Sequence, residues 1–278
     1  MAEQLASGAL RKMHTELSAP VSYALPLGEE LLPLNPYLGQ TIRLEYAGQI
    51  NCIYCDRKTN KSFNQGYCFP CFKRLARCDA CIVSPEKCHY AAGTCREPEW
   101  GEANCMIDHY VYLANTSGIK VGITRGSQVP TRWMDQGAAQ ARPIFRVSSR
   151  LQSGLVETLF SQHIADKTNW RAMLKGPPEA VDFEAVRLQL MNECSAALQA
   201  LWQSHGLQSI TELTDEAVVD IEYPVLEYPQ KVSSFNLDKN PVVEGTLLGI
   251  KGQYLIFDSG VINMRKYGGY SLTLSASA

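Results

Sequence analysis

Alternating apolar and polar residues predict β-strands at both ends of the chain. Between Val21 and Ile50, short alternating runs such as the one from Thr41 to Tyr46 are separated by prolines and glycines. That pattern is typical of strands joined by turns. Four similar runs follow Val242, again with glycines at the joints. We expect the C-terminal runs to form a small β-barrel or curled sheet, which the N-terminal strands help to complete.

Apolar side chains at three- and four-residue intervals predict helices in the middle of the chain. The clearest helix runs from Asp182 to Gly206, where the glycine supplies a stop signal. Cys194 lies on the apolar stripe of this helix, so we interpret it as a core residue. The other elements expected here are strands at 110–114, 119–124 and 143–148, a helix opened by Pro130 and a helix at 154–167.

Together these elements predict an α+β fold. The chain has 278 residues, a length typical of about two domains of ordinary size. The pattern divides it into N-terminal strands at 1–50, a cysteine-rich region at 51–109, a β-hairpin with helices at 110–176, a helical segment at 177–220 and a C-terminal β domain at 221–278.

Hydropathy and charge narrow the class of protein. No apolar run reaches the roughly 18 residues that a membrane-spanning helix needs. The segment from Met1 to Ser18 lacks a secretory cleavage pattern, so we expect a cytoplasmic protein. The net charge is −2, but residues 110–175 carry nine basic and three acidic side chains, whereas residues 179–244 carry twelve acidic and three basic ones. The basic stretch favours contact with phosphates, and the acidic C-terminal half offers a surface for a protein partner.

The cysteine spacing is the strongest chemical signal. Nine of the ten cysteines lie between Cys52 and Cys105. The first four form two Cys-x2-Cys pairs, with Cys52 and Cys55 separated by twelve residues from Cys68 and Cys71. Two such pairs can converge on one tetrahedral zinc ion, as in treble-clef folds with a short helix after the second pair. Disulfides or a chance cluster are the alternatives; without a secretory segment we expect the thiols to stay reduced.

A second zinc ion is predicted less specifically. The simplest ligand set is Cys78, Cys81, Cys88 and Cys95, with Cys105, His89 and His109 as alternates. Inert buried thiols or an iron–sulfur cluster remain alternatives, although the paired spacing favours zinc. Because four thiolates leave no open position on zinc, we interpret either ion as structural.

Residues 110–175 resemble a GIY-YIG nuclease domain. The resemblance rests on the order of a Tyr-Val-Tyr strand at 110–112, a Lys-Val-Gly-Ile-Thr strand at 120–124, Arg132 and Glu157. It implies a site in which Tyr112 positions or deprotonates the attacking water, Arg132 stabilises charge on the phosphate, and Glu157 holds Mg²⁺ or Mn²⁺. Lys120 stands where many members have a second tyrosine, as a phosphate anchor or a catalytic group. Asn169 falls near a helical asparagine of the superfamily.

Longer stretches extend the resemblance to an uncharacterised prokaryotic family with the same cysteine block before the hairpin. They include residues 61–68, 93–96, 132–138 and 249–254. The sequence therefore favours a zinc-stabilised protein that binds DNA or RNA and cleaves a phosphodiester. The basic residues expected to contact nucleic acid are Lys120, Arg125, Arg132 and Arg142. The alternative is a non-catalytic zinc-binding adaptor that binds RNA, a ribosome or a protein.

Overall fold

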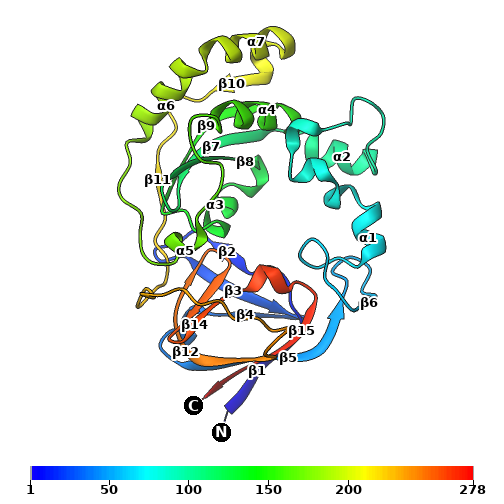
Figure 1. Ribbon diagram of the computed structural model, residues 1–278, viewed down its shortest axis with the longest axis vertical. Coiled ribbons are helices and arrows are strands. Elements are labelled where there is room, and N and C mark those ends of the chain that lie inside the picture. Colours follow the sequence, from blue (N-terminus) through cyan, green and yellow to red (C-terminus); the bar gives the residue numbers. More distant parts are fainter. Residues whose placement is uncertain (1, 278) are drawn as a thin grey trace.

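Three antiparallel sheets form the framework of the computed structural model, which describes residues 2–277 (Figure 1). Their combination with short helices confirms the expected α+β class. The strands are β1 (Ala2–Ala9), β2 (His14–Glu16), β3 (Ser22–Leu27), β4 (Glu30–Pro33), β5 (Thr41–Asn51), β6 (Lys58–Thr59), β7 (His109–Asn115), β8 (Ile119–Arg125), β9 (Gln140–Val147), β10 (Ile210–Glu212), β11 (Val219–Asp220), β12 (Val242–Lys251), β13 (Tyr254–Phe257), β14 (Gly260–Asn263) and β15 (Tyr270–Ser277). The α-helices are α1 (Phe69–Arg74), α2 (Pro98–Cys105), α3 (Thr131–Asp135), α4 (Arg150–Phe160), α5 (Trp170–Met173), α6 (Phe183–Glu193) and α7 (Ser195–His205).

The large sheet takes strands from both ends of the sequence. Its order is β1-β15-β5-β12-β13-β14, with β6 paired to the end of β5. The predicted alternation places Ile42 and Leu44 of β5, and Leu272 and Leu274 of β15, in one buried cluster. Over residues 2–277 this sheet stays open and does not close into a barrel. Of the two forms expected for the C-terminal strands, the closed barrel is therefore wrong. The N-terminal strands β1 and β5 join them in one sheet, whereas β2, β3 and β4 form a separate small sheet.

The hairpin predicted near residue 110 lies in a second sheet, of order β10-β9-β7-β8 with β11 beside β9. Val111 and Leu113 of β7 pack in a second core with apolar residues of α4, α6 and α7, and these helices lie on the far side from the large sheet (Figure 1). The helix α4 starts at Arg150, four residues earlier than predicted, because the side chain of Ser149 caps it. No described helix is long and apolar enough to cross a membrane.

The continuous helix expected from Asp182 to Gly206 is wrong in one detail, because the chain turns at Cys194 between α6 and α7. The one-residue break leaves Leu190, Cys194 and Leu198 buried in the same core. The spacing of the apolar residues is therefore unchanged across the turn, so the sequence pattern does not reveal where the helix breaks. Gly206 ends α7 as expected, with a φ of 86° that favours glycine.

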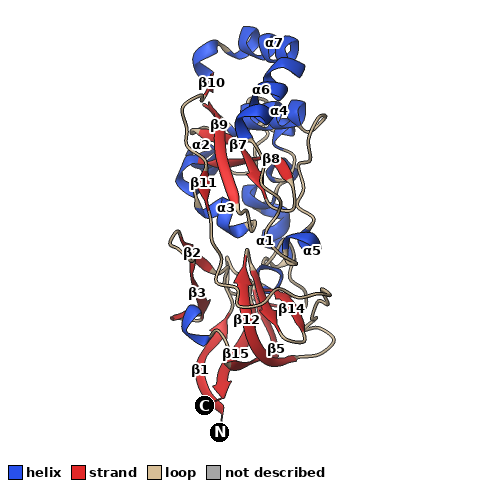
Figure 2. Ribbon diagram, turned by 90° about the vertical axis from the view of Figure 1, so that its left-hand side faces the viewer, coloured by secondary structure: helices blue, strands red, loops and turns tan. Residues whose placement is uncertain are grey.

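The large sheet and the hairpin sheet meet where α3 packs against the turn between β12 and β13. Figure 2 shows the halves of the molecule that contain these two sheets stacked along the long axis. The side chain of Gln253 donates a hydrogen bond of 2.9 Å to Asp135 Oδ1, while Lys12 forms an ion pair with Asp135. Gly252, with a φ of 62°, lies so close that a Cβ there would be 3.2 Å from the Asp135 carbonyl oxygen. These contacts fix α3, and with it Arg132, against the large sheet.

Candidate functional site

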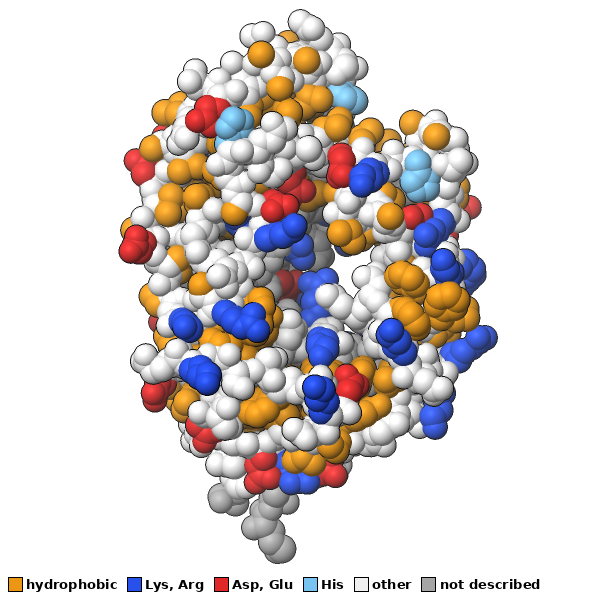
Figure 3. Space-filling view, in the orientation of Figure 1, with side chains coloured by type: hydrophobic (Ala, Val, Ile, Leu, Met, Phe, Trp, Pro, Cys, Tyr) orange, Lys and Arg blue, Asp and Glu red, His pale blue; other side chains and the backbone are white. Residues whose placement is uncertain are grey.

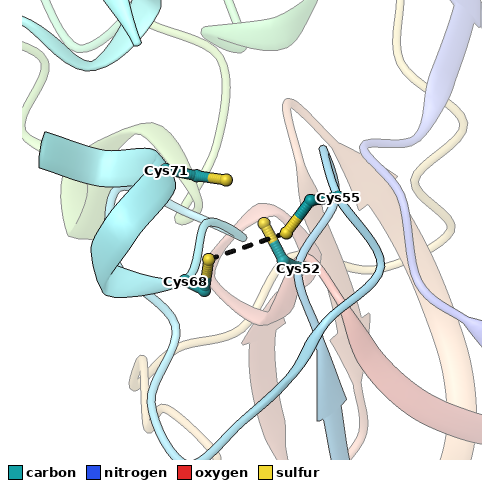
Figure 4. Close-up of side chains that lie close together, drawn as sticks. All are labelled: Cys52, Cys55, Cys68 and Cys71. Atoms are coloured by element: carbon teal, nitrogen blue, oxygen red, sulfur yellow. Dashed lines mark hydrogen bonds between the residues drawn. The ribbon is translucent and has the colours of Figure 1, made fainter. Parts of the chain in front are cut away.

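The first four cysteines lie together beyond the end of β5 (Figure 4). Cys52 and Cys55 follow that strand, while Cys68 and Cys71 lie at the start of α1. The four Sγ atoms all lie within 4.8 Å of one another, and Cys55 Sγ is 3.7 Å from Cys68 Sγ. Sulfurs placed about 2.3 Å from a tetrahedral zinc ion would be about 3.8 Å apart. The cluster can therefore hold a structural zinc ion, as its spacing predicts.

The electrostatics of the cluster also fit a metal. Burial opposes ionisation of Cys52, but hydrogen bonds from the backbone of Cys55, Cys68 and Tyr54 outweigh it and lower the Cys52 pKa to about 6. Burial and the neighbouring thiols raise the pKa of Cys71 to about 12. All four sulfurs can be thiolates only if a cation offsets their repulsion. Four soft thiolate donors suit zinc and leave it no open position, so this ion would stabilise the fold and take no part in catalysis.

The later cysteines divide between two places. Cys78 packs with the first cluster, and it does not line the cavity formed by the cysteines that follow it. His109 is buried at the start of β7, where its Nδ1 lies 2.7 Å from the carbonyl oxygen of Ile107. The remaining candidates line one small cavity: Cys81, Cys88, His89, Cys95 and Cys105.

A cleft of about 610 Å³ lies between the hairpin sheet, the cysteine-rich segment and the large sheet. Figure 3 shows Lys and Arg side chains around the hollow in this face. The cleft brings together Lys120 from β8, Arg132 from α3 and Glu157 from α4. Arg125, at the end of β8, also lines it. Residues that are far apart in the sequence therefore line the same cleft.

Tyr112 lies beneath the cleft and not in its wall. Its side chain is fully buried, and its hydroxyl donates a hydrogen bond of 2.9 Å to Oε1 of Gln136, which does line the cleft. Tyr112 is paired with Gly122 of β8, where a Cβ would come within 2.7 Å of both Cζ and the hydroxyl oxygen. The glycine is therefore needed to leave room for the tyrosine ring. Burial, together with the charge of Glu157, raises the pKa of Tyr112 to about 12, so the phenol is protonated at neutral pH.

Lys120 and Glu157 both have shifted pKa values. Burial, and then the charge of Arg132, lower the pKa of Lys120 to about 8. Burial, aided by Asp166 and opposed by Lys120, raises the pKa of Glu157 to about 7. No hydrogen bond or ion pair within residues 2–277 involves the Glu157 carboxylate. Glu157 is half-buried, and partly buried carboxylates without a partner are unfavourable for stability and are a feature of functional sites.

Two residues singled out from the sequence lie elsewhere. Arg142 is 7 % exposed, and its guanidinium donates to Glu184 (2.7 Å) and to the carbonyl oxygen of Thr214 (2.5 Å). Arg142 therefore belongs to a structural ion pair outside the cleft. Asn169 caps α5, because its side chain accepts a hydrogen bond of 3.2 Å from the backbone of Ala172.

Sequence reasoning missed three cations in the cleft. They are Lys12, Arg150 and Arg265. Arg150 lies in the basic stretch, and its charge was a usable signal. Lys12 and Arg265 come from the large-sheet half of the molecule, and nothing in the linear sequence connects them with the hairpin.

Comparison with known proteins assigns the chain to a family whose function is unknown. No curated protein and no solved structure matches the chain. Residues 39–272 match the family described as "Protein of unknown function (DUF2797)", which spans both the cysteine block and the hairpin. Since this match covers most of the sequence, the chain belongs to the DUF2797 family.

Proposed function

We propose that the chain binds nucleic acid in the cleft and cleaves a phosphodiester there, with chemistry similar to that of GIY-YIG nucleases. The observation that supports it is the meeting of Lys120, Arg132 and Glu157, from three separate elements, in one cleft above Tyr112. The resemblance to the superfamily rests on the order of these residues in the sequence. Their spatial convergence is an independent reason to treat them as one site.

The charge of the cleft suits a phosphate backbone. Its wall contains twice as many cationic as acidic side chains, and the cations come from both halves of the molecule. A concave site with an excess of one sign of charge attracts ligands of the opposite sign. The cations are Lys12, Lys120, Arg125, Arg132, Arg150 and Arg265, and the acidic residues are Asp135, Glu157 and Asp166.

Each residue would have a distinct role. Glu157 is an oxygen ligand that has no hydrogen-bond or ion-pair partner among residues 2–277, so it can hold Mg²⁺ or Mn²⁺, which would polarise the phosphate and its attacking water. Arg132 would stabilise the charge that develops on the phosphoryl oxygens. Tyr112, with its high pKa, would keep its proton and position Gln136 at the cleft floor. Lys120, with a pKa of about 8, is charged in most molecules at pH 7 and would anchor the phosphate.

One observation favours binding without cleavage. With a pKa of about 7, Glu157 is protonated in a large fraction of molecules at neutral pH, which weakens it as a metal ligand. The cations around it would still bind RNA, as the adaptor hypothesis requires.

The test is a cleavage assay on labelled single- and double-stranded DNA and RNA with Mg²⁺ or Mn²⁺. We expect the zinc-loaded protein to cut one of these substrates and Glu157→Gln to lose that activity by at least a hundredfold. Glu216→Gln is the matched control, because Glu216 is exposed and lies outside the cleft.

Binding without cleavage by the wild-type protein would support the adaptor in place of the nuclease. If the wild type neither binds nor cuts any of these nucleic acids, the nuclease hypothesis fails, and of the adaptor hypothesis only the version with a protein partner is left. Equal cleavage by wild type and Glu157→Gln would show that the activity arises elsewhere.

A further inference from the structure

The segment between the first cysteine cluster and β7 has almost no apolar core. Residues 79–104 contribute no side chain to any of the four hydrophobic clusters of the described chain. Their regular structure is limited to short 3-10 turns at Ala80–Ile82 and Pro85–Lys87, and to the helix α2. A segment of this length without apolar burial needs another source of stability, commonly disulfides or a metal ion.

Four cysteines of this segment line one small cavity, and their sulfur atoms are more widely spaced than those of the first cluster, which all lie within 4.8 Å of one another. Cys81, Cys88, Cys95 and Cys105 all line a cavity of about 10 Å³, which has room for a single ion or water. Cys105 is buried and the other three are half-buried. They come from a 3-10 turn, two loop positions and the end of α2, so one ion among them would tie together the whole segment.

The neighbouring polar groups have other partners. Asp79, Cys81 and His89 also form a close group, with ligand atoms within 4.8 Å of one another. However, the Asp79 carboxylate accepts hydrogen bonds from the Ala80 backbone (2.6 Å) and forms an ion pair with Arg96 (2.8 Å). His89 Nδ1 lies 2.8 Å from the Thr94 hydroxyl, and His89 Nε2 lies 3.4 Å from Asp79. Both ring nitrogens of His89 are thus engaged, whereas among residues 2–277 the four thiols make one hydrogen bond, which Cys95 Sγ donates to the carbonyl oxygen of Glu97 at 3.6 Å.

We propose that Cys81, Cys88, Cys95 and Cys105 bind a second structural zinc ion. This ligand set replaces Cys78 of the sequence-based assignment with Cys105. Four thiolates satisfy a tetrahedral ion, and they are the donors that zinc prefers in structural sites. The two zinc ions would follow one another along the chain, each holding a separate part of the cysteine-rich segment.

The second ion would also stiffen one wall of the cleft. Arg150 of α4 donates a hydrogen bond of 2.6 Å to the carbonyl oxygen of Ile82, next to the ligand Cys81. Gly154 of α4 lies so close to the turn at Pro85 that a Cβ there would be 2.6 Å from Pro85 Cβ. Ile82 and Pro85 both line the cleft, and α4 carries Glu157. The zinc-bound segment is therefore held directly against the helix that presents the carboxylate.

The test is the zinc content of the full-length protein, measured by mass spectrometry of the metal after exhaustive dialysis. We expect two zinc ions per wild-type chain and one per chain in Cys88→Ser or Cys105→Ser. Cys55→Ser should also keep one, and Cys55→Ser combined with Cys88→Ser should keep none. Cys78→Ser and His89→Gln are the matched controls and should keep both ions.

A wild-type stoichiometry of one zinc would overturn the proposal. Retention of two ions by Cys105→Ser, or loss of one by Cys78→Ser, would overturn the ligand set. Should the variants fail to fold, zinc X-ray absorption of the wild type still decides the question. We expect an average shell of four sulfurs at about 2.3 Å, and a nitrogen contribution would show that histidine is a ligand instead.

Discussion

Replacing Glu157 by glutamine should make the protein more stable at pH 8. The carboxyl group has a pKa of about 7 in the folded chain, against an ordinary value of 4.5. In the unfolded chain Glu157 loses its proton near pH 4.5, so between pH 4.5 and 7 the folded state binds more protons. Wild-type stability is therefore lost as the pH rises through this window, and the loss is complete above pH 7.

The size of the effect follows from that difference in proton affinity. At ~1.4 kcal/mol for each pKa unit, the full difference corresponds to about 3 kcal/mol. Solvent on the open side of the cleft screens part of it, so we expect about 1–2 kcal/mol. Glutamine has nearly the same shape and stays neutral at every pH. It should raise the urea midpoint at pH 8 by about 0.5 M and change it little at pH 5.

The assay is urea unfolding followed by tryptophan fluorescence at pH 5 and pH 8, for wild type, Glu157→Gln and the exposed control Glu216→Gln. The difference between variants at one pH cancels titrations common to all of them, including those of the cysteines. A midpoint gain of equal size at pH 5 and pH 8 would refute the argument from burial. At pH 8, added Mg²⁺ should stabilise the wild type and not Glu157→Gln, and equal stabilisation of both would exclude Glu157 as the metal ligand.

Two further substitutions test other parts of the site. Gly122→Ala would place a Cβ against the buried Tyr112 ring and should lower the free energy of unfolding by about 1–3 kcal/mol. The control Gly176→Ala, with open space around it, should change the free energy of unfolding by less than about 1 kcal/mol. Equal effects of the two substitutions in thermal unfolding would contradict the predicted clash with Tyr112. For nucleic-acid binding measured against salt, Arg265→Gln should reduce the slope of log K on log salt by about 0.7–0.9, while Arg142→Gln should leave it unchanged because that guanidinium is already paired. A lower slope for Arg142→Gln would move the binding surface away from the cleft.

Local patterns in the sequence were sufficient for the elements nearest the site. The strands expected at 110–114 and 119–124 agree with β7 and β8 to within one residue at each end. β7 contains a continuous apolar run, apolar residues alternate along β8, and turn residues separate the two strands. The spacing of Cys52, Cys55, Cys68 and Cys71 predicted their convergence for a similar reason, since two Cys-x2-Cys turns leave few geometries for the sulfurs.

Features that depend on tertiary contacts could not be predicted from the sequence. The irregular intervals after Cys71 give no turn geometry, so Cys78 could not be assigned to the first cluster from the sequence. Arg142 looked like its basic neighbours until the structure brought Glu184 beside it. Lys12 reaches the cleft only because Asp135 and Gln253 join the two halves, through contacts that span more than a hundred residues.

The sheet that combines both ends of the sequence has a consequence for the order of folding. The strand β5 lies between β15 and β12, and β1 pairs only with β15 among the described strands. During synthesis, β1 and β5 must wait for β15, which is translated more than two hundred positions later. Nascent chains would already contain the hairpin and the cysteine clusters but not the opposite wall of the cleft, which Arg265 helps to form. The complete cleft is thus a property of the finished polypeptide, and incomplete chains would have to be protected from aggregation while β1 and β5 lack their partner.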